Sequence, residues 1–91
     1  MENMELSKIV KEQREKIGIS QRELARRINV NNKTIHNIET GVIKKTNFLI
    51  LMKLSNELKI NLYTLAITAG YDKKEIKRKI DLMAKILKEF L

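Results

Sequence analysis

The clearest evidence for the fold lies in residues 19–41, which read Ile-Ser-Gln-Arg-Glu-Leu-Ala-Arg-Arg-Ile-Asn-Val-Asn-Asn-Lys-Thr-Ile-His-Asn-Ile-Glu-Thr-Gly. Apolar residues recur in it at helical spacing, which predicts two short helices. Ser20, with Glu23 three positions later, has the pattern of a capping box and predicts the start of the first helix. Asn29 tolerates a left-handed backbone and ends that helix, and Asn31 caps the second helix.

The turn between these two predicted helices is too short for them to lie antiparallel. We expect them to pack at a steep angle that leaves the second helix prominent, with the small residue Ala25 at their closest approach. The apolar side chains that anchor the pair to the core are Ile19, Leu24, Ile28, Val30, Ile35 and Ile38. The outward face of the second helix is polar and carries Asn32, Lys33, His36 and Asn37, with Thr34 and Thr40 beside it.

Four further helices are predicted around this pair, over residues 4–17, 46–58, 61–69 and 72–90. Thr46, Asn61 and a second capping box of Asp72 with Glu75 mark the last three starts. Glycines follow three of the apolar stretches, where a left-handed helix end favours glycine: Gly18, Gly41 and Gly70. The candidate core positions on these helices are Leu6, Ile9, Val10, Gln13, Ile17, Phe48, Leu49, Leu51, Met52, Leu54, Leu58, Leu62, Leu65 and Ala66. No strand pattern is present, so the predicted fold class is all-α.

Composition limits the possible functions. A chain of 91 residues forms one modest core, and without cysteine it has neither disulfides nor thiolate metal sites. The longest apolar run, Phe48 to Met52, is far shorter than the ~18 residues of a membrane span. Acidic and basic residues near the start interrupt any secretory signal, so we expect a cytoplasmic protein without a membrane partner.

Basic charge is concentrated in the middle of the chain. The whole sequence has a net charge of +8, and residues 20–47 hold six basic and two acidic residues. Such a surplus is consistent with a phosphate-binding surface, but equally with a solvated basic surface. Charge alone does not separate these two interpretations.

Two motifs at fixed spacing resemble the lambda repressor/Cro-like, or XRE-type, helix-turn-helix family. They are Ser20-Gln21-x-Glu23-Leu24-Ala25 and Thr34-Ile35-x-x-Ile38-Glu39-x-Gly41, and Ile60-Asn61-Leu62 resembles the family's approach to its fifth helix. The resemblance covers roughly residues 6–70. It implies a five-helix DNA-binding domain over residues 1–70, followed by a separate C-terminal helix over residues 71–91. It also implies a transcription regulator and not an enzyme.

The resemblance assigns roles to individual residues. Base-reading side chains are expected at Asn32, Lys33, Thr34, His36 and Asn37. Phosphate contacts are expected at Gln21, Arg22, Thr40, Lys44 and Lys45, whereas Arg26 and Arg27 are expected to be solvated. Arg14 and Glu39 are expected to form a partly buried ion pair. His36 is the only histidine, so no metal site is expected, and no residue pattern indicates a cofactor.

The C-terminal helix carries a heptad-like seam of Ile76, Ile80, Met83, Leu87 and Phe90. Since one helix-turn-helix reads few base pairs, we expect this seam to pair two copies on a palindromic operator. The alternatives are that the helix folds back onto the predicted helices at residues 4–17 and 61–69 of its own chain, or binds another protein such as an antirepressor or a toxin.

Three functions therefore remain open at this stage. The first is a dimeric, sequence-specific regulator, most simply a repressor. The second is an antitoxin-like component whose main partner is a protein bound through the C-terminal helix. The third is non-specific nucleic-acid packaging, which predicts similar affinity for any duplex.

Overall fold

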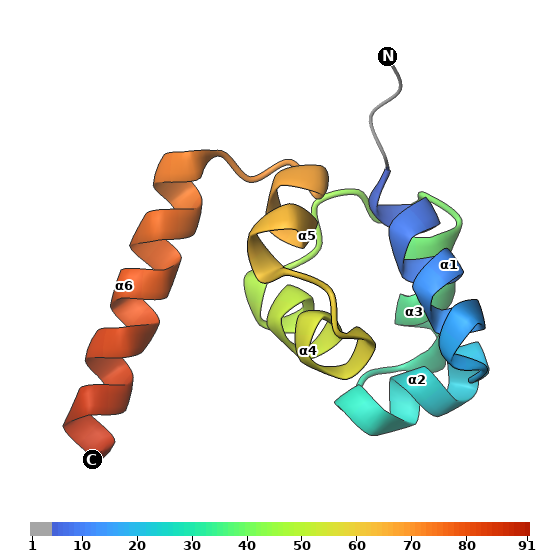
Figure 1. Ribbon diagram of the computed structural model, residues 1–91, viewed down its shortest axis with the longest axis horizontal. Helices are drawn as coiled ribbons and strands as arrows, with labels where there is room; N and C mark the ends of the chain where they lie inside the picture. The colour runs from blue at the N-terminus through green and yellow to red at the C-terminus, as the bar shows by residue number, and fades with distance from the viewer. Residues whose placement is uncertain (1–4) are drawn as a thin grey trace.

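The computed structural model describes residues 5–91, in which six α-helices and no strand are found (Figure 1). The helices are α1 (Leu6–Ile17), α2 (Gln21–Ile28), α3 (Asn32–Glu39), α4 (Phe48–Leu58), α5 (Leu62–Thr68) and α6 (Lys73–Phe90). The all-α prediction is confirmed. The predicted helix start at Met4 lies outside the described residues.

Helices α1 to α5 enclose a single apolar core, and α6 extends along one side of it (Figure 1). The helix-turn-helix pair α2–α3 packs closely together, α1 packs on α3, and α4 packs on both α2 and α5. The fully buried side chains come from every one of these helices: Val10, Leu24, Ile35, Ile38, Leu51, Leu54, Leu58 and Leu65. The core therefore packs against one face of α3 and leaves the opposite face exposed.

Left-handed residues end several helices as predicted. The three glycines have φ values of 90°, 82° and 103°, and Asn29 ends α2 with a φ of 55°. Lys59 ends α4 with a φ of 58°, which the sequence pattern does not indicate. An L side chain with a Cβ is strained in this region, so Lys59 occupies a place that suits glycine better.

The predicted start of α4 at Thr46 is wrong by one residue. The side chain of Asn47 accepts a hydrogen bond from the Ile50 amide over 2.9 Å and is the N-cap. Thr46 is buried, and its carbonyl accepts a hydrogen bond from the hydroxyl of Tyr71 over 2.8 Å. The hydrogen bond from Tyr71 therefore fixes Thr46, and Asn47, the next residue that can form a cap, begins the helix.

Two predicted core residues lie at the surface. Leu49 is 55% exposed on α4, and Ile17 is exposed at the last turn of α1. Both positions fit the helical spacing of the core, but each points past the neighbouring helices. The remaining predicted core positions of α1, α4 and α5 are buried or partly buried, as expected.

Helix α6 begins with the predicted capping box. The Asp72 side chain accepts from the Glu75 amide, and the Glu75 side chain accepts from the Asp72 amide. The start of α6 packs chiefly against α5, and Ile76 is buried there, whereas Leu87 is 62% and Phe90 is 83% exposed. Packing within the chain therefore covers the beginning of the predicted seam and leaves its end in solvent.

Candidate nucleic-acid interface

The α2–α3 pair is built by two side-chain caps and one left-handed turn. Ser20 Oγ accepts from the Glu23 amide over 3.0 Å, and Asn31 Oδ1 accepts from the Lys33 amide over 2.8 Å. Between the caps, Asn29 reverses the chain, and the Val30 amide donates to the Ala25 carbonyl. After this short connection α3 packs on α2 with one side and presents the other side to solvent.

The exposed side of α3 is polar. Asn32, Lys33 and His36 are exposed, and Asn37 is half-buried. These residues fall on one arc of the helix, opposite the buried Ile35 and Ile38, because helical residues three and four apart share a face. Thr34 is half-buried at the edge of this arc. The residues predicted to read bases therefore lie together on one helix, and two of them, Thr34 and Asn37, are half-buried.

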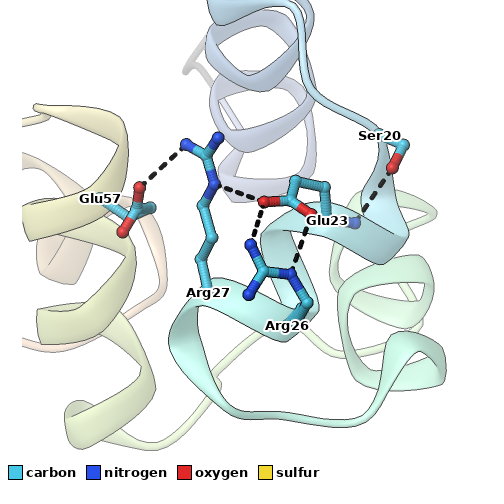
Figure 2. A network of polar contacts seen from close by, with 5 residues as sticks. All are labelled: Ser20, Glu23, Arg26, Arg27 and Glu57. Carbon is cyan, nitrogen blue, oxygen red and sulfur yellow. Dashed lines mark hydrogen bonds and ion pairs between the residues drawn. The ribbon is translucent and has the colours of Figure 1, made fainter.

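The capping box predicted at the start of α2 is only half formed (Figure 2). Instead of returning to Ser20, the Glu23 carboxylate accepts from Arg26 Nε over 3.0 Å and from Arg27 Nε over 2.8 Å. Arg27 also donates to Glu57 on α4 over 3.2 Å. Two neighbouring arginines draw the carboxylate away because charge-assisted bonds are stronger than a bond to a backbone amide.

The hydrogen bonds of this network shift the pKa values of the charged groups on the surface of α2. Hydrogen bonds from Arg26 and then Arg27 lower the pKa of Glu23 from 4.5 to about 2. The same bonds raise the pKa of both guanidinium groups. Both arginines are exposed and paired with carboxylates in this structure, Arg26 with Glu23 and Arg27 with Glu23 and Glu57.

The cations that remain beside the α3 face are few. Arg22, Lys33 and Lys44 form no ion pair with any residue from 5 to 91, and all three are exposed. Arg22 lies in the first turn of α2, Lys33 in the first turn of α3, and Lys44 in the loop between α3 and α4. Unpaired basic side chains therefore flank the polar arc along the chain.

Beneath this surface, Glu39 joins three helices. Its carboxylate accepts from Arg14 Nε over 2.6 Å and from Arg14 Nη2 over 2.9 Å, so the predicted ion pair is present. The Gln21 amide nitrogen donates to the same carboxylate over 3.0 Å. The hydrogen bonds that Arg14 donates to Glu39 raise the pKa of Arg14, so this guanidinium stays charged. Glu39 thus fixes the side chain of the first residue of α2, which the sequence did not indicate.

Two residues of the loop after α3, Thr40 and Lys45, are engaged in contacts within the chain. The Thr40 hydroxyl donates to the His36 carbonyl over 2.9 Å. Lys45 Nζ donates to the Glu75 carboxylate over 3.0 Å and lies 4.7 Å from the centre of the Tyr71 ring. Of the loop residues predicted to grip phosphate, Lys44 is therefore the one with a free charge.

A helix-turn-helix family profile matches residues 10–65. This span covers α2, α3 and the core that supports them, and it exceeds half of the chain. The chain belongs to the lambda repressor/Cro-like, XRE-type helix-turn-helix family. No curated protein and no solved structure matches the chain, so the assignment comes from this profile and from the geometry of α2 and α3.

Membership assigns a general function to this XRE-type protein, which is a DNA-binding transcription regulator. Members of the family are typically not enzymes. Across residues 5–91 no three metal-ligating side chains gather in one place, and His36 stands alone on the exposed face of α3. No helix in the described part of the chain is long and apolar enough to cross a bilayer.

Sequence reasoning missed Tyr71, the residue that connects α6 to the rest of this XRE-type domain. It is 8% exposed, and its ring meets Phe48 edge-on with the ring centroids 5.6 Å apart. A signal was present, because Tyr71 precedes the cap Asp72 and the apolar Ile76 follows four positions after that cap. Apolar residues at these two places form a hydrophobic staple, and here both are buried in one core.

Proposed function

We propose that this XRE-type regulator is a cytoplasmic repressor that reads a palindromic operator as a homodimer. The main support for the proposal is the exposed polar arc of α3, together with the exposed, unpaired cations Arg22 in α2 and Lys44 in the loop after α3. A helix of this width fits the major groove of B-DNA, where each base pair presents a distinct hydrogen-bond pattern. In this proposal Arg22 and Lys44 contact phosphates of the DNA backbone and fix the register.

Base readout is proposed for Asn32, Lys33, Thr34, His36 and Asn37. Asparagine pairs in two places with adenine, and lysine donates to the acceptor edge of guanine, so these side chains suit a specific site. Phosphate contacts are proposed for Gln21, Arg22, Thr40 and Lys44. Gln21 has a second amide hydrogen besides the one bound to Glu39. Thr40 reaches a phosphate once its hydroxyl leaves the His36 carbonyl.

Repression is the simpler regulatory outcome for such a domain. Occupying a site excludes any other protein from it, whereas activation needs a further contact with the transcription machinery. The proposed surface on α2, α3 and the loop after α3 needs contacts with DNA alone. We therefore propose repression by occlusion.

Dimerisation is proposed through α6, with residues 1–70 as the DNA-binding domain and residues 71–91 as the pairing element. The helix face that buries Ile76 and partly buries Met83 continues through Ile80, Leu87 and Phe90, which are exposed. Burial of one such side chain contributes roughly 1.5–3 kcal/mol. The end of this apolar strip is not covered by its own domain, so a partner that buries it would gain this free energy.

A second copy of the chain suits this strip better than a charged partner does. Beyond Ile80 the residues next to the seam are the uncharged Ala84, Ile86 and Leu91, by helical periodicity. Asp81, Lys85, Lys88 and Glu89 lie on the opposite side. Two identical helices can thus meet without bringing like charges together. A toxin or antirepressor on the same face is the competing occupant.

Selection of bound duplexes from a random DNA pool tests the function. We expect enrichment of a site with two-fold symmetry, whose half-sites are about one helical turn apart. A variant with Lys85→Ala, which removes one charge from the outer side of α6, is the matched control and should enrich the same site. Enrichment of no sequence would contradict the proposal and would favour non-specific packaging of DNA.

A further inference from the structure

Three contacts fasten the start of α6 to the loop that follows the recognition helix α3. The Tyr71 hydroxyl donates to the buried Thr46 carbonyl over 2.8 Å. Lys45 Nζ donates to Glu75 over 3.0 Å and also lies over the Tyr71 ring, 4.7 Å from its centre. We call Lys45, Tyr71 and Glu75 the α6 anchor.

The α6 anchor is itself rigidly supported. The Tyr71 ring packs edge-on against Phe48, the first residue of α4, at an interplanar angle of 75°. The Tyr71 amide donates to the Ala66 carbonyl of α5 over 3.0 Å. The segment between α5 and α6 is therefore bound to α4, to α5 and to the loop, and does not act as a free hinge.

Glu75 serves α6 and the loop at the same time. One of its carboxylate oxygens accepts the Asp72 amide in the capping box, and the other accepts from Lys45. These two bonds, the backbone one first, lower the pKa of Glu75 below its ordinary value, so the carboxylate is charged when the anchor forms. The Glu75 carboxylate, which caps α6, therefore also binds Lys45, the residue next to Lys44.

We propose that the α6 anchor sets the direction in which α6 leaves the DNA-binding domain and thereby sets the half-site spacing of the operator. The inference rests on the proposed pairing of two copies through α6. In that dimer, the path from one recognition helix to the other runs from α3 through the loop and the anchor into α6. Lys45 then acts as a positioning residue, and Lys44 beside it grips the phosphate.

The length of α6 makes spacing sensitive to this anchor. Helix α6 has 18 residues, and at ~1.5 Å per residue it is about 27 Å long. A tilt of about 10° at its start moves its far end by about 5 Å. Successive base pairs are ~3.4 Å apart along the DNA, so this tilt exceeds one base-pair step. A small error at the anchor therefore changes the register of the second half-site.

The test measures the affinity of the full chain for two kinds of duplex that carry the selected half-site. One kind has a single half-site, and the other has two half-sites whose separation changes in single base-pair steps around one helical turn. Glu75→Gln removes the charge that holds Lys45 and keeps an oxygen for the capping box. Tyr71→Phe removes the hydroxyl and keeps the ring. Asp81→Asn is the control, since it breaks the exposed pair with Lys77 on the same helix, away from the loop.

We expect the wild-type chain and Asp81→Asn to prefer one spacing sharply. In Glu75→Gln and Tyr71→Phe, the ratio of affinities between the best spacing and its neighbours should fall by about threefold, the scale of an exposed ion pair. Their affinity for the single half-site should stay at the wild-type value. Circular dichroism verifies folding. Tyr71→Phe leaves the buried Thr46 carbonyl without a donor; if this variant does not fold, Glu75→Gln, at a half-buried residue, decides the result.

Two results would overturn the inference and leave the proposed pairing intact. One is an unchanged spacing preference in both variants. The other is tighter binding of the single half-site by Glu75→Gln, which would mean that Glu75 only withholds Lys45 from the phosphate. A wild-type chain that binds the single half-site without any spacing preference would instead overturn the pairing, and the inference with it.

Discussion

The Arg14 guanidinium and the Glu39 carboxylate form a two-point hydrogen-bonded ion pair, 2.6 Å and 2.9 Å long, that joins α1 to the end of α3. The Gln21 amide binds the same carboxylate from α2. The recognition helix is thus fixed by a polar contact as well as by its apolar side. Removing either charge of this pair leaves the other buried without a counter-charge.

Glu39→Gln should lower the free energy of unfolding by about 3 kcal/mol, because the buried guanidinium of Arg14 loses its counter-charge. Urea unfolding followed by circular dichroism measures the loss. Glu57→Gln is the matched control, since it breaks the exposed pair with Arg27 and should cost less than about 1 kcal/mol. Equal losses in the two variants would mean that Arg14 and Glu39 do not form a structural pair.

Asn37→Ala and Lys44→Ala should weaken operator binding in different ways. Asn37→Ala should relax preference at one base pair and cost roughly 1–3 kcal/mol there. Lys44→Ala should weaken all sequences alike and reduce the slope of log affinity against log salt by about 0.9. Fluorescence anisotropy with matched and mismatched duplexes measures both effects, and identical behaviour of the two variants would refute the division into base and phosphate contacts.

Acid should destabilise the protein through Glu23. Its pKa is about 2 in the folded chain against 4.5 ordinarily, so its stabilising contribution is complete above pH 4.5 and is lost as the pH falls toward 2. Glu75, whose pKa is also lowered, acts in the same direction. In urea unfolding at a series of pH values, Glu23→Gln should show a shallower loss across this window. A curve parallel to that of the wild-type chain would contradict the prediction.

Lys59→Gly should stabilise the protein by about 0.5–1 kcal/mol. Left-handed backbone costs an L residue about 1–2 kcal/mol, and the greater chain entropy that glycine loses on folding offsets part of the gain. Asn29→Gly, at the other left-handed helix end, should change stability less, because asparagine tolerates this conformation. Thermal unfolding compares the two variants, and a larger gain at Asn29 would contradict this explanation.

Ile80→Asp combined with Leu87→Asp should convert a dimer into a folded monomer, since both side chains are exposed within one chain and tolerate the change there. Sedimentation at micromolar concentration measures the state. Leu49→Asp, at an exposed leucine of α4, is the control and should leave the dimer intact. If the wild-type chain and the double variant are both monomers, α6 does not pair, and the heterologous partner becomes the better explanation.

Local patterns predicted most of the fold, because caps, left-handed turns and helical periodicity depend on residues a few positions apart. The Ser20, Asn31 and Asp72 caps and the turn at Asn29 were all predicted in this way. The start of α4 was not, because the bond from Tyr71 to the Thr46 carbonyl joins residues 25 positions apart. Leu49 fits the helical period but lies beyond the reach of its neighbours, which periodicity alone does not reveal.

The candidate site shows the same division. The polar arc of α3 was predicted from residues within one helix, and it lies where expected. The sequence did not predict which cations are paired with a carboxylate, because pairing depends on which carboxylate lies close in space. Glu23 takes Arg26 and Arg27, and Glu75 takes Lys45, so net charge along the sequence overstates the basic charge that is free to meet DNA.

The solvent-facing end of α6 has a consequence for how such a regulator responds to its own abundance. A lone copy holds Leu87 and Phe90 in water, and in the proposed dimer a second copy covers them. When most copies are single, occupancy of a two-fold site rises with the square of their concentration, by mass action. At low occupancy, halving the concentration of the chain would then cut occupancy to about one quarter, so dilution by growth without new synthesis lowers occupancy more steeply than it lowers the concentration.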